Sequence, residues 1–258
     1  MLFCYCVGLK KMKKLFYKNI VWMFGVLFFA MLLGTLQCKM LNVKFHHLCS
    51  IENYYPDIYD FFSYIVVGDN VGEIFYLSWN DMGLMFQPLS FLLFGLFVSV
   101  SNFLTKPKGY YQFIYARKYK ERNFVNGLFT EQVALIFIYS VAYYVSVFCY
   151  GYIGGYAITG WDKILTALVL GAVSKIVFLL FVKEIVLYIY LRRGLTDSIL
   201  AGFVLVVILL MIDAKMKCQK INLLLFSSAL NFQGMLLILV LCVIVHIINR
   251  KIDLLKLE

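Results

Sequence analysis

Gln87, Glu131 and Lys175 stand inside long apolar runs, where water cannot solvate their side chains. An ionisable group in such a run is costly to bury, so it usually pairs with an opposite charge or faces a water-filled cavity. We therefore predict that Glu131 and Lys175 pair or share one cavity, with Gln87 as a further intramembrane polar residue of the pathway. The alternative is that the runs end earlier and that both charged side chains reach the membrane surface.

The segment FHHLC is the nearest approach to a metal or nucleophile site, because it holds His46, His47 and Cys49. Both chemistries need a third group held nearby, and neighbours in sequence are not necessarily neighbours in space. The chain also has no P-loop and no zinc-protease or Gly-x-Ser-x-Gly signature. We expect a solvated loop at FHHLC, and no catalytic, cofactor or metal site on this chain.

A basic and aromatic stretch, KPKGYYQFIYARKYKERNFVNGLF, joins two apolar runs. Its aromatic and basic residues recur at helical spacing, so the sequence predicts an amphipathic helix with an aromatic end in the lipid headgroups and a basic end in the cytoplasm. Such a helix can pass a push from a soluble partner into the membrane. The simpler alternative is a charged topology anchor. The predicted docking residues are Tyr111, Tyr115, Arg117, Lys118, Lys120 and Arg122.

The composition requires a membrane around these residues. Of the 258 residues, 63% are hydrophobic and only 15% are charged, whereas soluble domains carry about 25% charged residues. Such a chain cannot cover an apolar core with a polar surface, so we predict an all-α integral membrane protein. The net charge of +10 is typical of cytoplasmic loops rich in Lys and Arg, and we expect no nucleic-acid partner.

We interpret six apolar runs as transmembrane helices of one membrane domain that covers residues 1–258, although the fifth run, at 14 residues, is shorter than the about 20 residues that a span needs. The predicted spans are residues 20–36, 83–104, 125–149, 164–191, 199–212 and 234–248. Between them lie an extracellular, aromatic-rich loop at 37–82 and the cytoplasmic coupling loop at 105–124. The first span follows a basic flank but lacks a cleavage site, so we interpret it as a retained anchor, whether translation starts at Met1 or at Met12.

The distribution of basic residues predicts the orientation. With both termini cytoplasmic, 17 Lys and Arg residues lie inside and six lie outside, when Lys183 is counted in the cytoplasmic loop after the fourth span. The outer loop is acidic and rich in tyrosine and phenylalanine, which suggests short helices at the membrane interface. A disulfide between Cys38 and Cys49 in this loop is left open by their spacing.

The order of six spans with a basic helix between the second and third resembles the permease subunit of type-2 ABC exporters. It is most similar to small permeases of bacteriocin or lantibiotic immunity and peptide export. These carry a pattern like Arg-x-Lys-Ser-Arg-aromatic in that loop, where this chain has KYKERNF with Lys first and Glu121 in place of Ser. The tail NRKIDLL resembles the family's Arg-x-Asp ending, and KKLFYKN resembles its elbow helix.

The resemblance implies a bacterial cell-membrane protein that is not itself an enzyme. A partner ATP-binding subunit would bind ATP and dock on the 110–124 helix. A second copy or a related permease would complete the path for a peptide or peptide antibiotic. Two other functions stay open: a non-transport accessory, immunity or sensor protein, and a membrane-embedded peptidase.

The predicted pairing of Glu131 with Lys175 has a direct test. We expect the double exchange, Glu131→Lys with Lys175→Glu, to retain more function and more folded protein than either single change, because it restores opposite charges. Expression level and the function assayed in cells measure this. A double variant no better than the single ones would contradict the pairing.

Overall fold

A computed structural model describes residues 2–52, 55–62, 82–104, 121–216 and 232–251. In these ranges the chain is all-helical and contains no strand. The fold class predicted from the sequence is confirmed to that extent. The elements are α1 (Leu2–Glu52), α2 (Ile58–Phe62), α4 (Met82–Leu104), α6 (Glu121–Ile153), α7 (Trp161–Thr166), the π-helical turn η3 (Ala167–Gly171), α8 (Ala172–Arg193), α9 (Leu195–Met216) and α10 (Phe232–Arg250).

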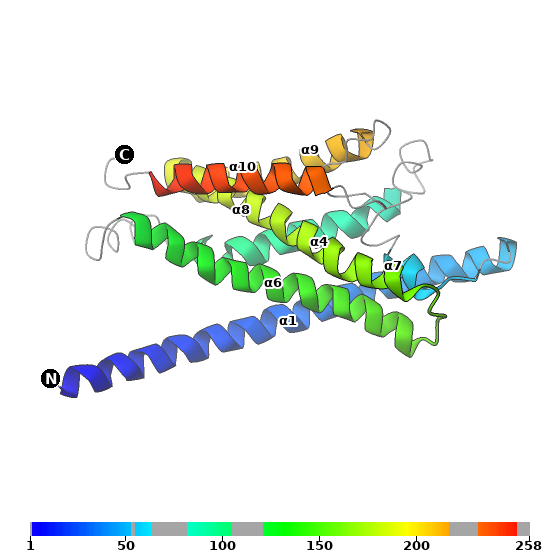
Figure 1. The fold of residues 1–258 in the computed structure, drawn as a ribbon, viewed down its shortest axis with the longest axis horizontal. Helices are drawn as coiled ribbons and strands as arrows, with labels where there is room; N and C mark the ends of the chain where they lie inside the picture. Colours follow the sequence, from blue (N-terminus) through cyan, green and yellow to red (C-terminus); the bar gives the residue numbers. More distant parts are fainter. Residues whose placement is uncertain (1, 53–54, 63–81, 105–120, 217–231, 252–258) are drawn as a thin grey trace.

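The long helices α1, α4, α6, α8, α9 and α10 alternate in direction along the long axis of the molecule (Figure 1). The start of α1 and the end of α10 lie at the same end of this bundle, which we call the terminal end. The opposite end is called the far end. Helices α6 and α8 are central: α6 packs against α1, α4, α8 and α10, and α8 packs against α4, α9 and α10.

The helices extend past several of the predicted boundaries. Helix α1 continues to Glu52, so residues 37–52, predicted as the start of the outer loop, are helical. Helix α6 begins at Glu121, inside the predicted coupling loop, and α9 is longer than the predicted fifth span. The length of an apolar run locates only the apolar part of a helix. The backbone hydrogen bonds of the helix continue through polar residues until a helix-breaking residue such as Pro56 is near.

Two of the described stretches are long and apolar enough to cross a membrane, Val21–Val43 in α1 and Gln132–Ile153 in α6. Three shorter apolar stretches lie at Leu89–Ser101, Leu195–Leu209 and Gly234–Arg250. These stretches support a membrane protein. The sequence-based prediction that all six long helices cross the membrane, with both termini cytoplasmic, stays a prediction.

Large apolar side chains cover the outside of the bundle. Helix α10 is exposed along most of its length, including Leu237 and Val243, and α1 exposes Phe24 and Phe28 by two thirds of their surface. Many polar side chains are instead buried, among them Gln37, Gln132, Lys183 and Glu184. A water-soluble protein rarely exposes an apolar surface this continuous. The arrangement suits a bundle surrounded by lipid.

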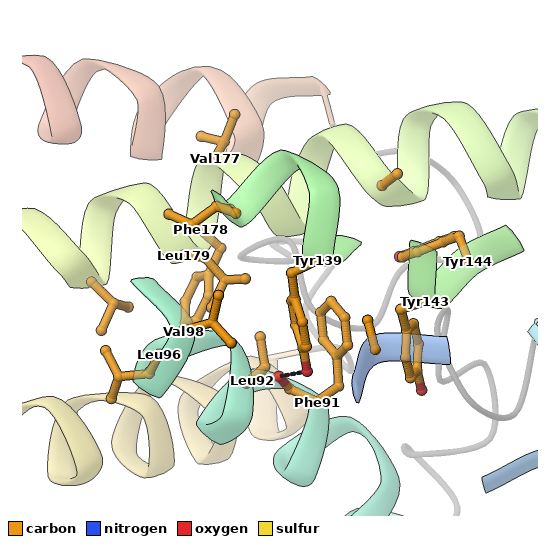
Figure 2. Packing of buried hydrophobic residues seen from close by; sticks show 14 of the residues in the cluster. Phe91, Leu92, Leu96, Val98, Tyr139, Tyr143, Tyr144, Val177, Phe178 and Leu179 are labelled. Carbon is orange, nitrogen blue, oxygen red and sulfur yellow. Dashed lines mark hydrogen bonds between the residues drawn. The ribbon is translucent and has the colours of Figure 1, made fainter. Parts of the chain in front are cut away.

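Aromatic rings join α4 to α6 in the core. The ring of Phe91 on α4 stacks on Tyr139 at 5.1 Å between centroids and lies 4.4 Å from Tyr143. The Tyr139 hydroxyl donates a hydrogen bond of 2.9 Å to the Phe91 carbonyl (Figure 2). Phe178 and Leu179 of α8 close this cluster and are fully buried.

The short helix α2 caps the far end of α6. Its Ile58, Phe61 and Phe62 are fully buried, and the Ile58 amide donates 3.0 Å to the Ala157 carbonyl beyond α6. Asp57 and Asp60 cap the start of α2 reciprocally, because each carboxylate accepts from the other residue's backbone N–H at 2.8–2.9 Å. Phe61 also meets Phe45 of α1 edge to face at 5.1 Å. This end of the bundle is therefore closed by apolar contacts.

Gly95 lies at a tight contact of α4 with side chains of α6 and α8. A Cβ at this position would lie 2.8 Å from Leu179 Cδ1 and 3.0 Å from Tyr139 Cε1, inside normal contact distance. Gly25 on α1 is its matched control, since a Cβ there would meet nothing within 4 Å. Small residues at such contacts allow helix backbones to pack tightly in membranes.

We expect Gly95→Ala to lower the unfolding midpoint of the detergent-purified protein relative to Gly25→Ala. Both changes gain about 1 kcal/mol of helix propensity, but only Gly95→Ala also overpacks the core, which costs about 1–3 kcal/mol. Thermal unfolding followed by circular dichroism measures the difference. Equal midpoints would show that α4 does not pack this closely on α6 and α8.

Candidate functional site in a buried polar cluster

A buried ion pair lies in the interior of α8. Lys183 Nζ is 2.7 Å from Glu184 Oε1, and neither side chain is exposed to solvent. The sequence count had placed Lys183 in a cytoplasmic loop. That placement is wrong, and the predicted fourth span of residues 164–191, which includes Lys183, was the better guide: α8 continues ten residues beyond Lys183 to Arg193 and buries it. Two buried charges are tolerated only when geometry and further hydrogen bonds compensate their loss of water.

Helix α10 supplies those further contacts. Asn249 Nδ2 donates to Glu184 Oε2 at 2.6 Å and to the Glu184 backbone carbonyl at 3.0 Å. His246 Nδ1 lies 3.3 Å from Glu184 Oε1, without the alignment of a hydrogen bond. His246 and Asn249 are three residues apart, so both project from one face of α10. Glu184 thus holds the last helix of the bundle against α8.

Helix α6 closes the cluster with an aromatic ring. Lys183 Nζ lies 4.7 Å from the centroid of the Phe129 ring, a cation–π distance. The same ring lies 4.7 Å from the imidazole of His246. Phe129 therefore contacts residues of both α8 and α10. A displacement of α6 would change the surroundings of the ion pair directly.

Some buried polar atoms near this cluster have no partner in the described part of the chain. Both amide atoms of Gln132, one turn along α6 from Phe129, make no hydrogen bond there, and neither does Asn249 Oδ1. Buried polar atoms are nearly always hydrogen-bonded. These donors and acceptors can bind water or a polar group of another molecule inside the bundle.

A second polar network joins α1, α4 and α6. The Tyr143 hydroxyl donates to Gln37 Oε1. The Gln37 amide in turn donates to Ser90 Oγ at 2.6 Å. Gln37 was predicted to lie at the start of the outer loop, but it is buried between helices. The network joins the long first helix to the pair α4 and α6.

The structure places the predicted pathway residues in three helices. Lys175 is buried in α8, eight residues, or about 12 Å, from Lys183 toward the far end. Gln87 in α4 and Glu131 in α6 are helical, and their side chains lie outside the described part. Glu131 is two residues from Phe129, so its backbone lies nearer the level of Lys183 than of Lys175. The pairing of Glu131 with Lys175 stays a prediction.

The predicted docking residues fall almost wholly outside the described part of the chain. Arg122 lies in the first turn of α6, where only the backbone is described. The others precede that helix, in the range 105–120 that the structure does not describe: Tyr111, Tyr115, Arg117, Lys118 and Lys120. The end of α4 and the start of α6 flank this range, and both lie toward the terminal end of the bundle (Figure 1).

The FHHLC segment lies on α1 rather than in a loop. His46 is exposed and Cys49 is half-buried. Neither Cys38 nor Cys49 is in a disulfide, and eleven residues of one helix separate them by about 16 Å. A disulfide would need its Cα atoms within about 7 Å, so that possibility is excluded. Among the described residues, no group of three metal-ligand types comes together.

Sequence reasoning missed the residues of the buried cluster, although a signal was present. The charged pair Lys183 and Glu184, in VKEIV, interrupts the run from Ile164 to Leu191, whose only other charged residue is Lys175. Adjacent opposite charges at that point indicate a buried pair as well as a loop. His246 and Asn249 close another apolar run, where polar residues are common at membrane surfaces. Only the packing of α10 on α8 shows that these residues contact the ion pair and do not simply lie at the membrane surface.

Comparison with known proteins identifies no relative: no family model, curated protein or solved structure matches this chain.

We expect Glu184→Gln and Lys183→Met each to destabilise the purified protein by about 3–5 kcal/mol, because each leaves a buried charge without its partner. The double variant should lose much less than the sum of the two. Unfolding in detergent, arranged as a double-mutant cycle, measures the coupling. Lys251→Met, at an exposed position, is the control and should change little. Additive losses would show that the two charges do not interact.

Proposed function

We propose that this chain is a multi-pass permease subunit of an ABC-type exporter in a bacterial cell membrane, with a peptide or peptide antibiotic as its cargo. An ATP-binding partner subunit would supply the energy. A second permease copy, identical or related, would complete the path. Two features support the proposal: the apolar outer surface of the bundle, and contacts that can transmit movement of the basic stretch to the buried polar cluster.

Membrane embedding is supported by the distribution of polarity. Apolar side chains of α1 and α10 point outward, while an ion pair and several amides are buried between helices. Lipid reverses the usual preference of a protein surface, because a polar side chain facing hydrocarbon has no partner. The alternating directions of the long helices agree with six crossings and with both termini on one side (Figure 1).

The packing of α4 on α6 carries the transporter proposal. These two helices flank the basic stretch, and Phe91, Tyr139 and Tyr143 fasten them together in the core (Figure 2). A partner that moves the loop must therefore move both helices as a unit. Phe129 on the same α6 contacts Lys183 and His246. Motion at the loop is thus joined through one rigid helix to the buried polar cluster.

The mechanism follows from these contacts. Closure of the partner on ATP would press on the loop and shift α6 against α8 and α10. Withdrawal of the Phe129 ring would expose the ion pair and the unpartnered amide of Gln132 to the interior. Packed interfaces switch between discrete arrangements rather than deforming continuously. The polar cluster would open as the path between two permease copies opens.

Affinity purification of the tagged full-length chain from its native membrane tests the proposal. We expect a P-loop ATPase to copurify, and to be lost when Lys118, Lys120 and Arg122 are all changed to Ala, because these side chains supply the docking charge. Mass spectrometry of the retained proteins measures both results. Lys215, Lys217 and Lys220 changed together to Ala form the matched control, since they lie on the opposite predicted side of the membrane and should leave the complex intact.

Retention of the ATPase by both triple variants would remove the basic loop as the docking segment. Absence of any ATPase from the wild-type preparation would contradict the transporter proposal and favour a non-transport accessory protein. In that case the loop would serve as a topology anchor alone.

A further inference from the structure

A lateral groove opens between α1 and α6 in the half of the bundle toward the far end. Its volume is about 570 Å³, and its lining includes Met31, Thr35, Asn42 and His46 from α1, with Ser146 and Cys149 from α6. The α1 residues recur at intervals of four and seven, so they form one stripe along the helix. The groove is separate from the Lys183 cluster and has no role in the proposed transport mechanism.

The hydroxyl groups of Thr35 and Ser146 in the lining need no further acceptor for their protons. The Thr35 hydroxyl donates 2.9 Å to the Leu32 carbonyl, and the Ser146 hydroxyl donates 2.7 Å to the Tyr143 carbonyl, each within its own helix. With these donors satisfied, an apolar chain can lie against them without cost. Met31 adds a thioether surface to the lining, at the end of the groove away from Asn42 and His46.

The end of the groove nearest the far end of the bundle is polar, and its described lining residues include no carboxylate. The Tyr156 hydroxyl donates to Asn42 Oδ1, which directs the Asn42 amide NH₂ toward other acceptors. Burial raises the pKa of Tyr156 above its ordinary value, so the phenol keeps the proton it donates. His46 is exposed one turn beyond Asn42. Lys39 is exposed on α1 three residues before Asn42, outside the lining of the groove. Donors and a positive charge at this end suit a phosphate group.

The length of the groove matches one leaflet of a bilayer. From Met31 to Asn42 is eleven residues, about 16 Å of helix, and half of a hydrocarbon core of about 30 Å is about 15 Å. The apolar floor therefore spans the hydrocarbon depth of one leaflet, and the polar end lies at headgroup level. The neighbouring outer face of α1, with Leu32, Leu36 and Met40, is exposed and apolar.

We propose that this groove is a binding site for one phospholipid of the leaflet at the far end of the bundle. An acyl chain would lie along Thr35, Ser146 and Cys149, and the phosphate would accept hydrogen bonds from Asn42 and His46 beside Lys39. An anionic phospholipid is preferred, because the lining residues that the structure describes include the donors Asn42 and His46 and no acidic side chain. The site rests on the membrane embedding in the proposed function and not on the ATPase partner.

Native mass spectrometry of the detergent-purified full-length protein, incubated with dioleoyl phosphatidylglycerol or dioleoyl phosphatidylcholine, tests the site. We expect the wild type to retain one phosphatidylglycerol per chain after the detergent is removed. Thr35→Trp, at an exposed position in the groove, should lose this adduct. Leu36→Trp is the matched control on the next residue, outside the lining, and should retain it. Met31→Trp provides a second groove-filling variant if Thr35→Trp does not fold.

Lys39→Gln tests the headgroup separately and should reduce the preference for phosphatidylglycerol over phosphatidylcholine while leaving the fold intact. Equal retention by Thr35→Trp and Leu36→Trp would overturn the proposal, since the lipid would then be bound elsewhere. A wild type that retains a peptide mass, a second copy or no lipid would overturn it as well. ATPase copurification is scored on the same preparations, so failure of the transporter proposal is visible independently of the lipid result.

Discussion

The buried pair of Lys183 and Glu184 sets the constraint that the surrounding helices satisfy. Two full charges without solvent contact are stable only with close partners, and the further partners come from two other helices. Asn249 and His246 come from α10, and Phe129 comes from α6. The ion pair therefore requires three helices to meet at one level. It fixes the position of the last helix, which otherwise presents mostly apolar surface.

The need to give every buried polar group a partner also explains other contacts in the core. Where the outside is apolar, hydrogen bonds between helices are the means of satisfying a side chain such as Gln37. Tyr143 and Ser90 are the hydrogen-bond partners of Gln37. The Tyr139 hydroxyl donates a hydrogen bond to the backbone carbonyl of Phe91, which holds α4 against α6. These contacts join α1, α4 and α6 into one unit. The unit meets α8 at the glycine contact and at the ion pair.

Two polar features of different character result from this arrangement. The Lys183 cluster is enclosed, charged and joined to α6, so it can respond to movement of that helix. The groove beside Thr35 is open to the side, uncharged along its floor and polar at one end. Enclosed charge suits a switching element, and a lateral groove suits a ligand that arrives from the membrane. The fold separates them along its axis, one toward the terminal end and one toward the far end.

The sequence by itself determined the helical class, the approximate places of the six apolar runs and the basic stretch between the second and third. Hydropathy is a local property, so a window of neighbouring residues contains it. It did not determine that α1 continues through His46 and Cys49, because a helix ends at a breaker and not where its polarity changes. It also left two interpretations of Lys183 open: a charged residue in a cytoplasmic loop, or a charged residue buried inside a helix bundle. Only the tertiary structure decided between them, since the partners of Glu184 lie more than sixty residues away on α10. Contacts at that separation depend on how helices pack, which no local pattern of residues records.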